Sequence, residues 1–175
     1  MKIIIAPQAF KGSISALDAA HAMEAGVKAV VPDAETVLVP IADGGDGTLE
    51  TLVEVSDGRV ETTKVTGPLG KKVNAEWGAM GDGRTAVIEM ARTSGLVLLK
   101  PTQLNALKAT TIGLGEAIRA ALDAGYRHFI IGIGGSATND AGAGMAQALG
   151  IKMLDASGDE IHRGGAALEK LHRID

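Results

Sequence analysis

The sequence predicts an α/β protein with two domains. Three apolar runs are each followed by a glycine-rich polar loop and then by a helical pattern, which favours a parallel sheet covered by helices. Residues 59–90 instead show short alternating runs separated by turns, which is typical of an antiparallel meander. We therefore expect a boundary near residue 62, with residues 1–62 in the first α/β domain and 63–175 in a second, mixed one.

The first unit begins with an apolar run, residues 2–6, that predicts a strand. Ser15, with Asp18 three residues later, approximates a capping box and predicts a helix start. An apolar stripe at helical spacing follows, and Pro32 ends the helix. The stripe consists of Leu17, Ala20, Met23, Val27 and Val30. In the loop before the helix, Lys11 beside Gly12 and Ser13 is a candidate phosphate contact, although such a lysine is often only solvated.

The second strand, residues 36–40, leads into the loop 41–48 and then into a short helix. This loop holds two carboxylates, Asp43 and Asp46, spaced by glycines. Such carboxylates suit Mg²⁺, which prefers a few oxygen ligands together with water and phosphate. The alternative is a turn capped by Asp46 or Thr48, with Asp43 solvated.

The middle of the chain predicts three strands and a helix. A helical pattern returns after residue 111, and Gly125 is a plausible C′ residue for it. The strands fall near residues 60–65, 73–77 and 85–90, with a turn at residues 81–83. Further along we expect a strand at 129–133, a helix at 141–149, a strand at 151–154 and a helix within 163–175.

The loop after residue 133 carries the densest set of ligand groups. Gly134 and Gly135 would let the backbone approach a ligand, because no Cβ stands in the way. The polar side chains that follow are Ser136, Thr138, Asn139 and Asp140. A helix start at this point would suit a phosphate, and the plainer alternative is a β-to-α turn in which Asn139 or Asp140 is a helix cap. Since loops at the carboxyl ends of parallel strands share one edge of the sheet, we expect the three loops to form one site.

Composition excludes several classes of function. A net charge of −4, a pI near 5.6 and 2% aromatic residues argue against nucleic acid as a partner. The chain has no cysteine, and no apolar run approaches the roughly 20 residues of a membrane span. The four histidines show no metal-ligand spacing. We expect a cytoplasmic protein without a membrane partner.

A rival interpretation is a nicotinamide-dependent oxidoreductase. Gly132, Gly134 and Ala137 satisfy the spacing G-x-G-x-x-A after a strand, and Asp155 imitates the ribose-binding acid. Against it, such a fingerprint usually opens the first strand unit of its domain. The Walker type of phosphate loop is absent from the sequence.

At the same three loops the sequence resembles the glycerate kinase family, the bacterial type that phosphorylates glycerate with ATP. The resemblance is collinear over the chain and rests on the residue runs 5–7, 10–13, 42–48, 65–70, 86–91, 94–96, 110–116 and 131–140. It implies an ATP-dependent, Mg²⁺-requiring kinase for D-glycerate. It also implies two α/β domains around a cleft. One is flavodoxin-like and built from the N-terminal and C-terminal parts of the family sequence, and the other is inserted.

We expect Lys11, Asp43 and Asp140 to be catalytic, with Asp43 and Asp46 on Mg²⁺. The expected substrate- and phosphate-binding residues are Ser13, Gly44, Gly45, Thr48, Gly134, Gly135, Ser136, Thr138 and Asn139. Which loop faces which ligand stays open.

The chain departs from the family pattern at individual positions and in its length. The substituted positions are Gln8, Ala9, Arg92, Leu114 and Ala141. Asp175 corresponds to a position about halfway along the family sequence. We therefore expect this chain to be an N-terminal fragment that is inactive alone and associates through incomplete sheet edges. A further alternative is a folded remnant that binds ligand without catalysis.

Overall fold

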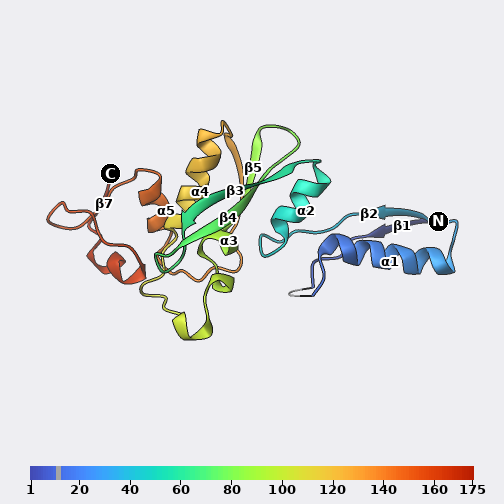
Figure 1. The fold of residues 1–175 in the computed structure, drawn as a ribbon, viewed down its shortest axis with the longest axis horizontal. Coiled ribbons are helices and arrows are strands. Elements are labelled where there is room, and N and C mark those ends of the chain that lie inside the picture. The colour runs from blue at the N-terminus through green and yellow to red at the C-terminus, as the bar shows by residue number, and fades with distance from the viewer. Residues whose placement is uncertain (11–12) are drawn as a thin grey trace.

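The structure, a computed structural model, describes residues 1–10 and 13–175 and is elongated, with a small N-terminal unit extending from a larger body (Figure 1). In the N-terminal unit, strands β1 (Lys2–Ile5) and β2 (Glu35–Leu38) form a parallel pair joined through helix α1 (Ala16–Val30). The Ser15 side chain accepts a hydrogen bond from the backbone N–H of Asp18, so the predicted helix start is confirmed.

The predicted apolar stripe of α1 is only partly buried. The buried residues of the helix are Ala16, Ala19 and Ala20, whereas Met23 and Val30 are exposed. The physical reason is size: a four-residue strand spans about 13 Å, and a fifteen-residue helix spans about 22 Å. Two short strands cannot cover the whole helix.

The body is built on one four-stranded sheet in the order β3-β4-β5-β6. The strands are β3 (Arg59–Thr66), β4 (Lys72–Ala79), β5 (Thr85–Glu89) and β6 (His128–Gly132). The first three pair antiparallel, which confirms the predicted meander, and β6 pairs parallel to β5.

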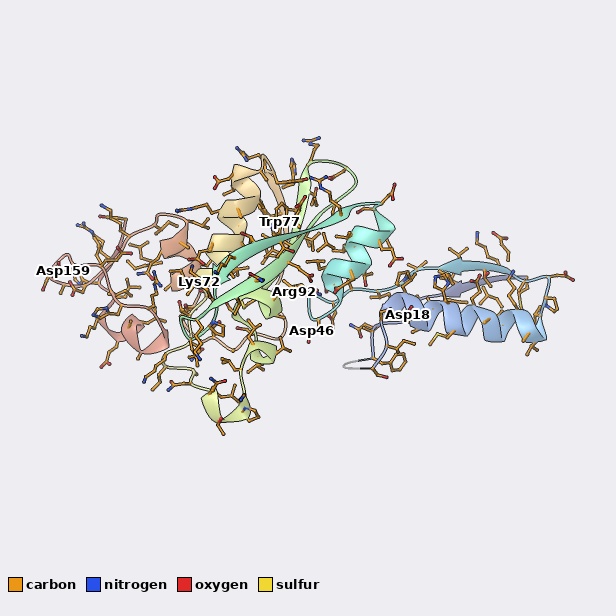
Figure 2. The ribbon with its side chains drawn as sticks, viewed as in Figure 1. Asp18, Asp46, Lys72, Trp77, Arg92 and Asp159 are labelled. Carbon is orange, nitrogen blue, oxygen red and sulfur yellow. The ribbon has the colours of Figure 1, made fainter. Side chains whose placement is uncertain are left out.

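Helices cover both faces of this sheet (Figure 1). Helix α2 (Thr48–Val55) packs Leu49 and Val53 against Val87 of β5. Ile88, the next residue of β5, belongs to the larger core beneath α4 (Ile112–Asp123), because successive side chains of a strand point to opposite faces. Trp77, labelled in Figure 2, lies in this larger core. Helix α2 is therefore part of the body, although it precedes residue 62.

The turn between β4 and β5 is held by one aspartate. Asp82 accepts hydrogen bonds from the Thr85 hydroxyl and from the backbone N–H groups of Arg84 and Thr85. These bonds, that of the hydroxyl first, lower the pKa of Asp82 from 3.8 to about 2.

We expect Asp82 to stabilise the fold fully above pH 4, with the contribution lost as pH falls toward 2. The sign follows because a lowered native pKa favours the folded state wherever the carboxyl is ionised. Acid unfolding of the wild type and of Asp82→Asn, followed by circular dichroism, checks this. Equal acid sensitivity of the two proteins would contradict it.

The C-terminal part contains short elements. These are α3 (Met90–Ser94), the 3₁₀ turns η1 (Leu96–Leu98), η2 (Pro101–Gln103) and η3 (Gly165–Lys170), α5 (Ala143–Ala148), β7 (Met153–Leu154) and β8 (Arg173–Ile174). The helix predicted within residues 163–175 is confirmed only as the short 3₁₀ helix η3, which Gly164 precedes with a φ of 96°. Residues 173–174 instead form β8, which pairs antiparallel with β7.

Two other predicted boundaries are resolved by backbone conformation. The helix expected to begin at Ala141 starts at Ala143, because Ala141 and Gly142 both have positive φ values. Gly125 follows α4 with a φ of 98°, as predicted for a C′ residue. Among the residues that the structure describes, no helix is both long and apolar enough to cross a membrane.

Candidate functional site

The three loops predicted to meet do lie together. The backbone N–H of Gly134 donates to the carbonyl of Gly44 at 2.8 Å, and that of Ile41 donates to the carbonyl of Pro7 at 2.9 Å. These bonds join the loops after β1, β2 and β6 around a cavity of about 390 Å³. The lining residues are Gln8, Ala9, Ile41, Ala42, Asp43, Gly45, Asp46, Gly47, Thr48, Gly134 and Gly135. We call this cavity the loop site.

Gly132, at the end of β6, and Gly134, in the loop after it, lie against the backbone of residues 44–45. A Cβ on Gly132 would lie 2.6 Å from the carbonyl oxygen of Gly44, and one on Gly134 would lie 2.6 Å from the Cα of Gly45. Both separations are shorter than side chains tolerate, so the absent Cβ lets the two loops interlock. The close approach made by Gly134 is therefore to the backbone of another loop, whereas a ligand contact by this glycine stays a prediction.

We expect Gly134→Ala to destabilise the protein by about 1–3 kcal/mol, because the new methyl group must push the 44–45 backbone away. Urea unfolding measures the change. Gly26→Ala in α1 is the matched control, since nothing lies within 4 Å of its new methyl group. There we expect a gain of about 0.5–1 kcal/mol. If both variants gained stability, the loops would not be interlocked as described.

Asp43 and Asp46 both line the loop site and are exposed. Asp43 Oδ1 accepts a hydrogen bond from the backbone N–H of Gly45 at 2.9 Å, which fixes the side chain in the loop. A Cβ placed on Gly135 would lie 3.7 Å from Asp46 Oδ1, so Asp46 lies beside the third loop. Thr48 is buried, and its hydroxyl oxygen accepts a hydrogen bond from the backbone N–H of Gly44. This oxygen is therefore already engaged within the loop.

The loop site has two carboxylates in its lining that are suitable as Mg²⁺ ligands. Among the described residues, no group of three or more histidine, cysteine or acidic side chains is arranged to hold a metal. Mg²⁺ in phosphoryl-transfer sites is commonly held by one or two carboxylates, with water and phosphate completing the shell. Asp43 and Asp46 fit that donor set.

The segment after Gly135 pairs with residues 94–96 and not with the other two loops. The hydroxyls of Ser136 and Thr138 lie 2.8 Å apart, and the N–H of Thr138 donates to Ser136 Oγ. The adjoining backbone pairs with residues 94–96, through Leu96 N–H to the carbonyl of Gly135 and Ala137 N–H to that of Ser94. Ser136, Thr138 and Asn139 are not among the residues lining the loop site.

Asp140 is placed in the interior rather than in the loop site. It is 1% exposed. Its carboxylate accepts from the N–H and hydroxyl of Thr111 and from the N–H groups of Gly142 and Gly144. These donors belong to the starts of α4 and α5. Asp140 therefore joins two helix N-termini, as in the alternative in which it acts as a helix cap.

The predictions for the first loop fall partly outside the described residues. Lys11 and Gly12 are not described. Ser13 is exposed, its N–H donates to the carbonyl of Phe10 at 2.8 Å, and it does not line the loop site.

A second cavity, of about 750 Å³, adjoins the loop site and shares Asp46 and Gly47 with it. Arg92, on α3, lies in its wall and pairs with Glu50 of α2, Glu76 of β4 and Glu89. Figure 2 labels Asp46 and Arg92 close to the middle of the molecule. Sequence reasoning missed this cluster, since its members are far apart in the chain.

Glu89 is the central carboxylate of the cluster. It is 1% exposed, accepts from the backbone N–H of Leu49 at 2.8 Å and pairs with Arg92 Nε at 2.8 Å. Burial alone would lower the pKa of the Arg92 guanidinium, but the hydrogen bonds and charges of Glu89 and Glu50 raise it above its usual value. The cluster thus ties the first turn of α2, and with it the loop 43–48, to the sheet.

The fold is that of a mixed α/β protein, and the loop site lies where β1, β2 and β6 end. The glycerate kinase family model matches residues 3–175, and the chain belongs to this family.

Several proteins that are similar to this chain are named as glycerate kinases. The chain is 59% identical to a glycerate kinase of Bacillus subtilis (strain 168) and 53% identical to a glycerate 2-kinase of Escherichia coli (strain K12). Each match covers 100% of this chain and 46% of the relative. A crystal structure assigned to glycerate kinase 2 of Salmonella typhimurium LT2 matches with a TM-score of 0.89 and 55% identity, over 100% of this chain and 47% of that one. The chain therefore spans about half the length of these proteins, and the mixed α/β class is confirmed.

Proposed function

We propose that this chain acts in the ATP-dependent phosphorylation of D-glycerate, giving phosphoglycerate. The observation that carries the proposal is the loop site, in which two exposed carboxylates and a glycine backbone meet in a chain of the glycerate kinase family. The name of the Escherichia coli relative favours the 2-hydroxyl as the acceptor.

Phosphoryl transfer needs little covalent chemistry from the protein, so positioning and charge neutralisation supply most of the rate. We assign Asp43 to the substrate hydroxyl, as a base, or to the metal, and Asp46 to the metal. When bound, Mg²⁺ would neutralise phosphate charge beside these two carboxylates. The N–H groups of the loops that line the site would orient the phosphate or the glycerate carboxylate.

Other assignments follow from the geometry or stay predictions. Asp140 would act as a positioning residue, since its oxygens are filled by donors from α4 and α5. A phosphate contact by Lys11 stays a prediction, as do roles for Ser13, Ser136, Thr138 and Asn139 and the cytoplasmic location.

We propose two domains in the whole protein, the first of them flavodoxin-like. The packing of α2 on the body favours a division before Thr48 over the expected one near residue 62, which falls within β3.

Association through β1 and β2 also stays a proposal. These strands form a two-stranded sheet, and Ile4 and Val39 nearby are exposed. Sedimentation of the 175-residue chain at several concentrations tests it.

The test of function is a full-length chimera, in which this chain replaces the matching 175 residues of the Bacillus subtilis relative. We expect ATP- and Mg²⁺-dependent ADP release that requires D-glycerate, with nuclear magnetic resonance of the product identifying the phosphorylated hydroxyl. A folded chimera that releases no ADP with D-glycerate would contradict the proposal.

The oxidoreductase alternative receives little support. A dinucleotide fingerprint needs a helix that starts within its glycine turn, but β6 ends at Gly132 and α5 begins at Ala143. Asp155 instead accepts from the N–H groups of Ser157 and Asp159, in a turn. We expect calorimetry to detect no NAD binding. Micromolar NAD affinity without any response to ATP would favour the oxidoreductase.

A further inference from the structure

Helix α2 begins without a capping side chain of its own. Its N-cap residue is Gly47, which has a φ of 91° and no side chain that could accept from the N–H groups of the first turn. The acceptor comes instead from Glu89, the last residue of β5, which is 1% exposed. Its Oε1 accepts a hydrogen bond from the backbone N–H of Leu49 at 2.8 Å, and its charge suits the positive end of the helix dipole. One buried residue of the sheet therefore holds the start of α2.

The hydrogen bonds of Thr48 connect the start of α2 to the loop before it. The backbone N–H of Thr48 donates to the carbonyl of Gly45 at 3.2 Å, and the Thr48 hydroxyl oxygen accepts from the N–H of Gly44 at 2.9 Å. Asp43 in turn accepts from the N–H of Gly45. A shift of the first turn of α2 would therefore displace the carboxylate of Asp43.

The backbone of Glu89 is joined to the strand that leads into the other loop. Glu89 is the register partner of Gly132 in the parallel pair of β5 and β6, and Gly134 follows two residues later. The N–H of Gly134 donates to the carbonyl of Gly44. Figure 1 shows α2 on the side of the body that faces β1 and β2. Glu89 thus contacts, through its backbone and its side chain, the two elements from which these loops extend.

We propose that Glu89 is a positioning residue for the loop site, which fixes the carboxylates of Asp43 and Asp46 relative to the loop after β6. The inference rests on the phosphoryl transfer proposed above, in which positioning supplies most of the rate and a small displacement of the reacting groups is costly. Both oxygens of Glu89 are used, because Oε2 accepts from Arg92 Nε at 2.8 Å. A carboxylate can accept at both oxygens, whereas an amide has only one acceptor oxygen.

Glu89→Gln tests this, because its single amide oxygen cannot accept from both Leu49 and Arg92. In the 175-residue chain we expect hydrogen exchange of the backbone N–H groups of Leu49 and Gly44, followed by nuclear magnetic resonance, to accelerate by about tenfold or more. In the full-length chimera, kcat for ADP release should fall by about tenfold or more, with a smaller change in KM for D-glycerate. Arg92→Leu/Glu89→Gln frees the amide oxygen for Leu49 and should recover both the exchange rates and most of kcat.

Two further variants complete the test. Thr48→Val breaks the next bond in the series without altering a buried charge, so it tests the same point if Glu89→Gln does not fold. It should lower kcat, and Thr48→Ser, which keeps the hydroxyl, should restore it. Ile118→Val removes one methyl group from the larger core beneath α4 and should leave exchange at Leu49 and kcat unchanged.

Each outcome separates this inference from the proposed function. Unchanged exchange at Leu49 and Gly44 in Glu89→Gln would overturn the inference, as would an active chimera whose kcat does not respond to Glu89→Gln. An equal fall of kcat in Ile118→Val would also overturn it, because the cause would then be a general loss of stability. A chimera that releases no ADP before any substitution would instead overturn the proposed function, and hydrogen exchange would still decide whether Glu89 holds the loop.

Discussion

Asp43→Asn in the full-length chimera is expected to lower turnover by a factor of about 10² or more, with little change in thermal stability. Asparagine keeps the oxygen that accepts the N–H of Gly45, so the loop retains its hydrogen bond. What is lost is the negative charge facing the loop site, which the proposed reaction uses as a base or metal ligand. Initial rates of ADP release and thermal unfolding of the same samples measure the two effects.

The control for this prediction is Asp123→Asn, which removes the same charge from an exposed position at the end of α4. It should retain the rate of the unsubstituted chimera. Should Asp43→Asn also retain that rate, Asp43 would be only a turn residue. Should both variants lose rate equally, the effect would come from net charge and not from the loop site.

The largest expected effect on stability comes from Arg92→Leu. Removing the guanidinium leaves Glu89 buried without its cationic partner, and also leaves Glu50 and Glu76 close to it. Breaking a buried ion pair in this way costs about 3 kcal/mol. Urea unfolding at pH 7 measures the loss.

Two further variants locate the cause of that loss. Arg92→Leu/Glu89→Gln should recover part of the stability, because glutamine carries no charge and can still accept from the N–H of Leu49. Arg173→Ala, which breaks an exposed pair with Asp175, should leave stability nearly unchanged. If Arg92→Leu were as harmless as Arg173→Ala, the cluster would not hold α2 to the sheet.

Local patterns in the sequence determined most of the elements of this protein. Alternating residues predicted the meander of β3, β4 and β5, and Ser15 with Asp18 predicted the start of α1. The loops after β1, β2 and β6 were also correctly expected to meet. These features depend on neighbouring residues or on the shared edge of parallel strands, and both can be read along the chain.

Only the tertiary structure decided the roles of Gly134, Asp140 and Arg92. Gly134 lies against the backbone of another loop, and the carboxylate of Asp140 accepts hydrogen bonds from the starts of two helices. Arg92 pairs with acids from three elements. The helix predicted within residues 163–175 is reduced to η3 for a related reason, since β8 satisfies its backbone groups on β7. In each case the deciding contact joins residues that local patterning cannot bring together, because burial and hydrogen-bond satisfaction depend on the whole packed chain.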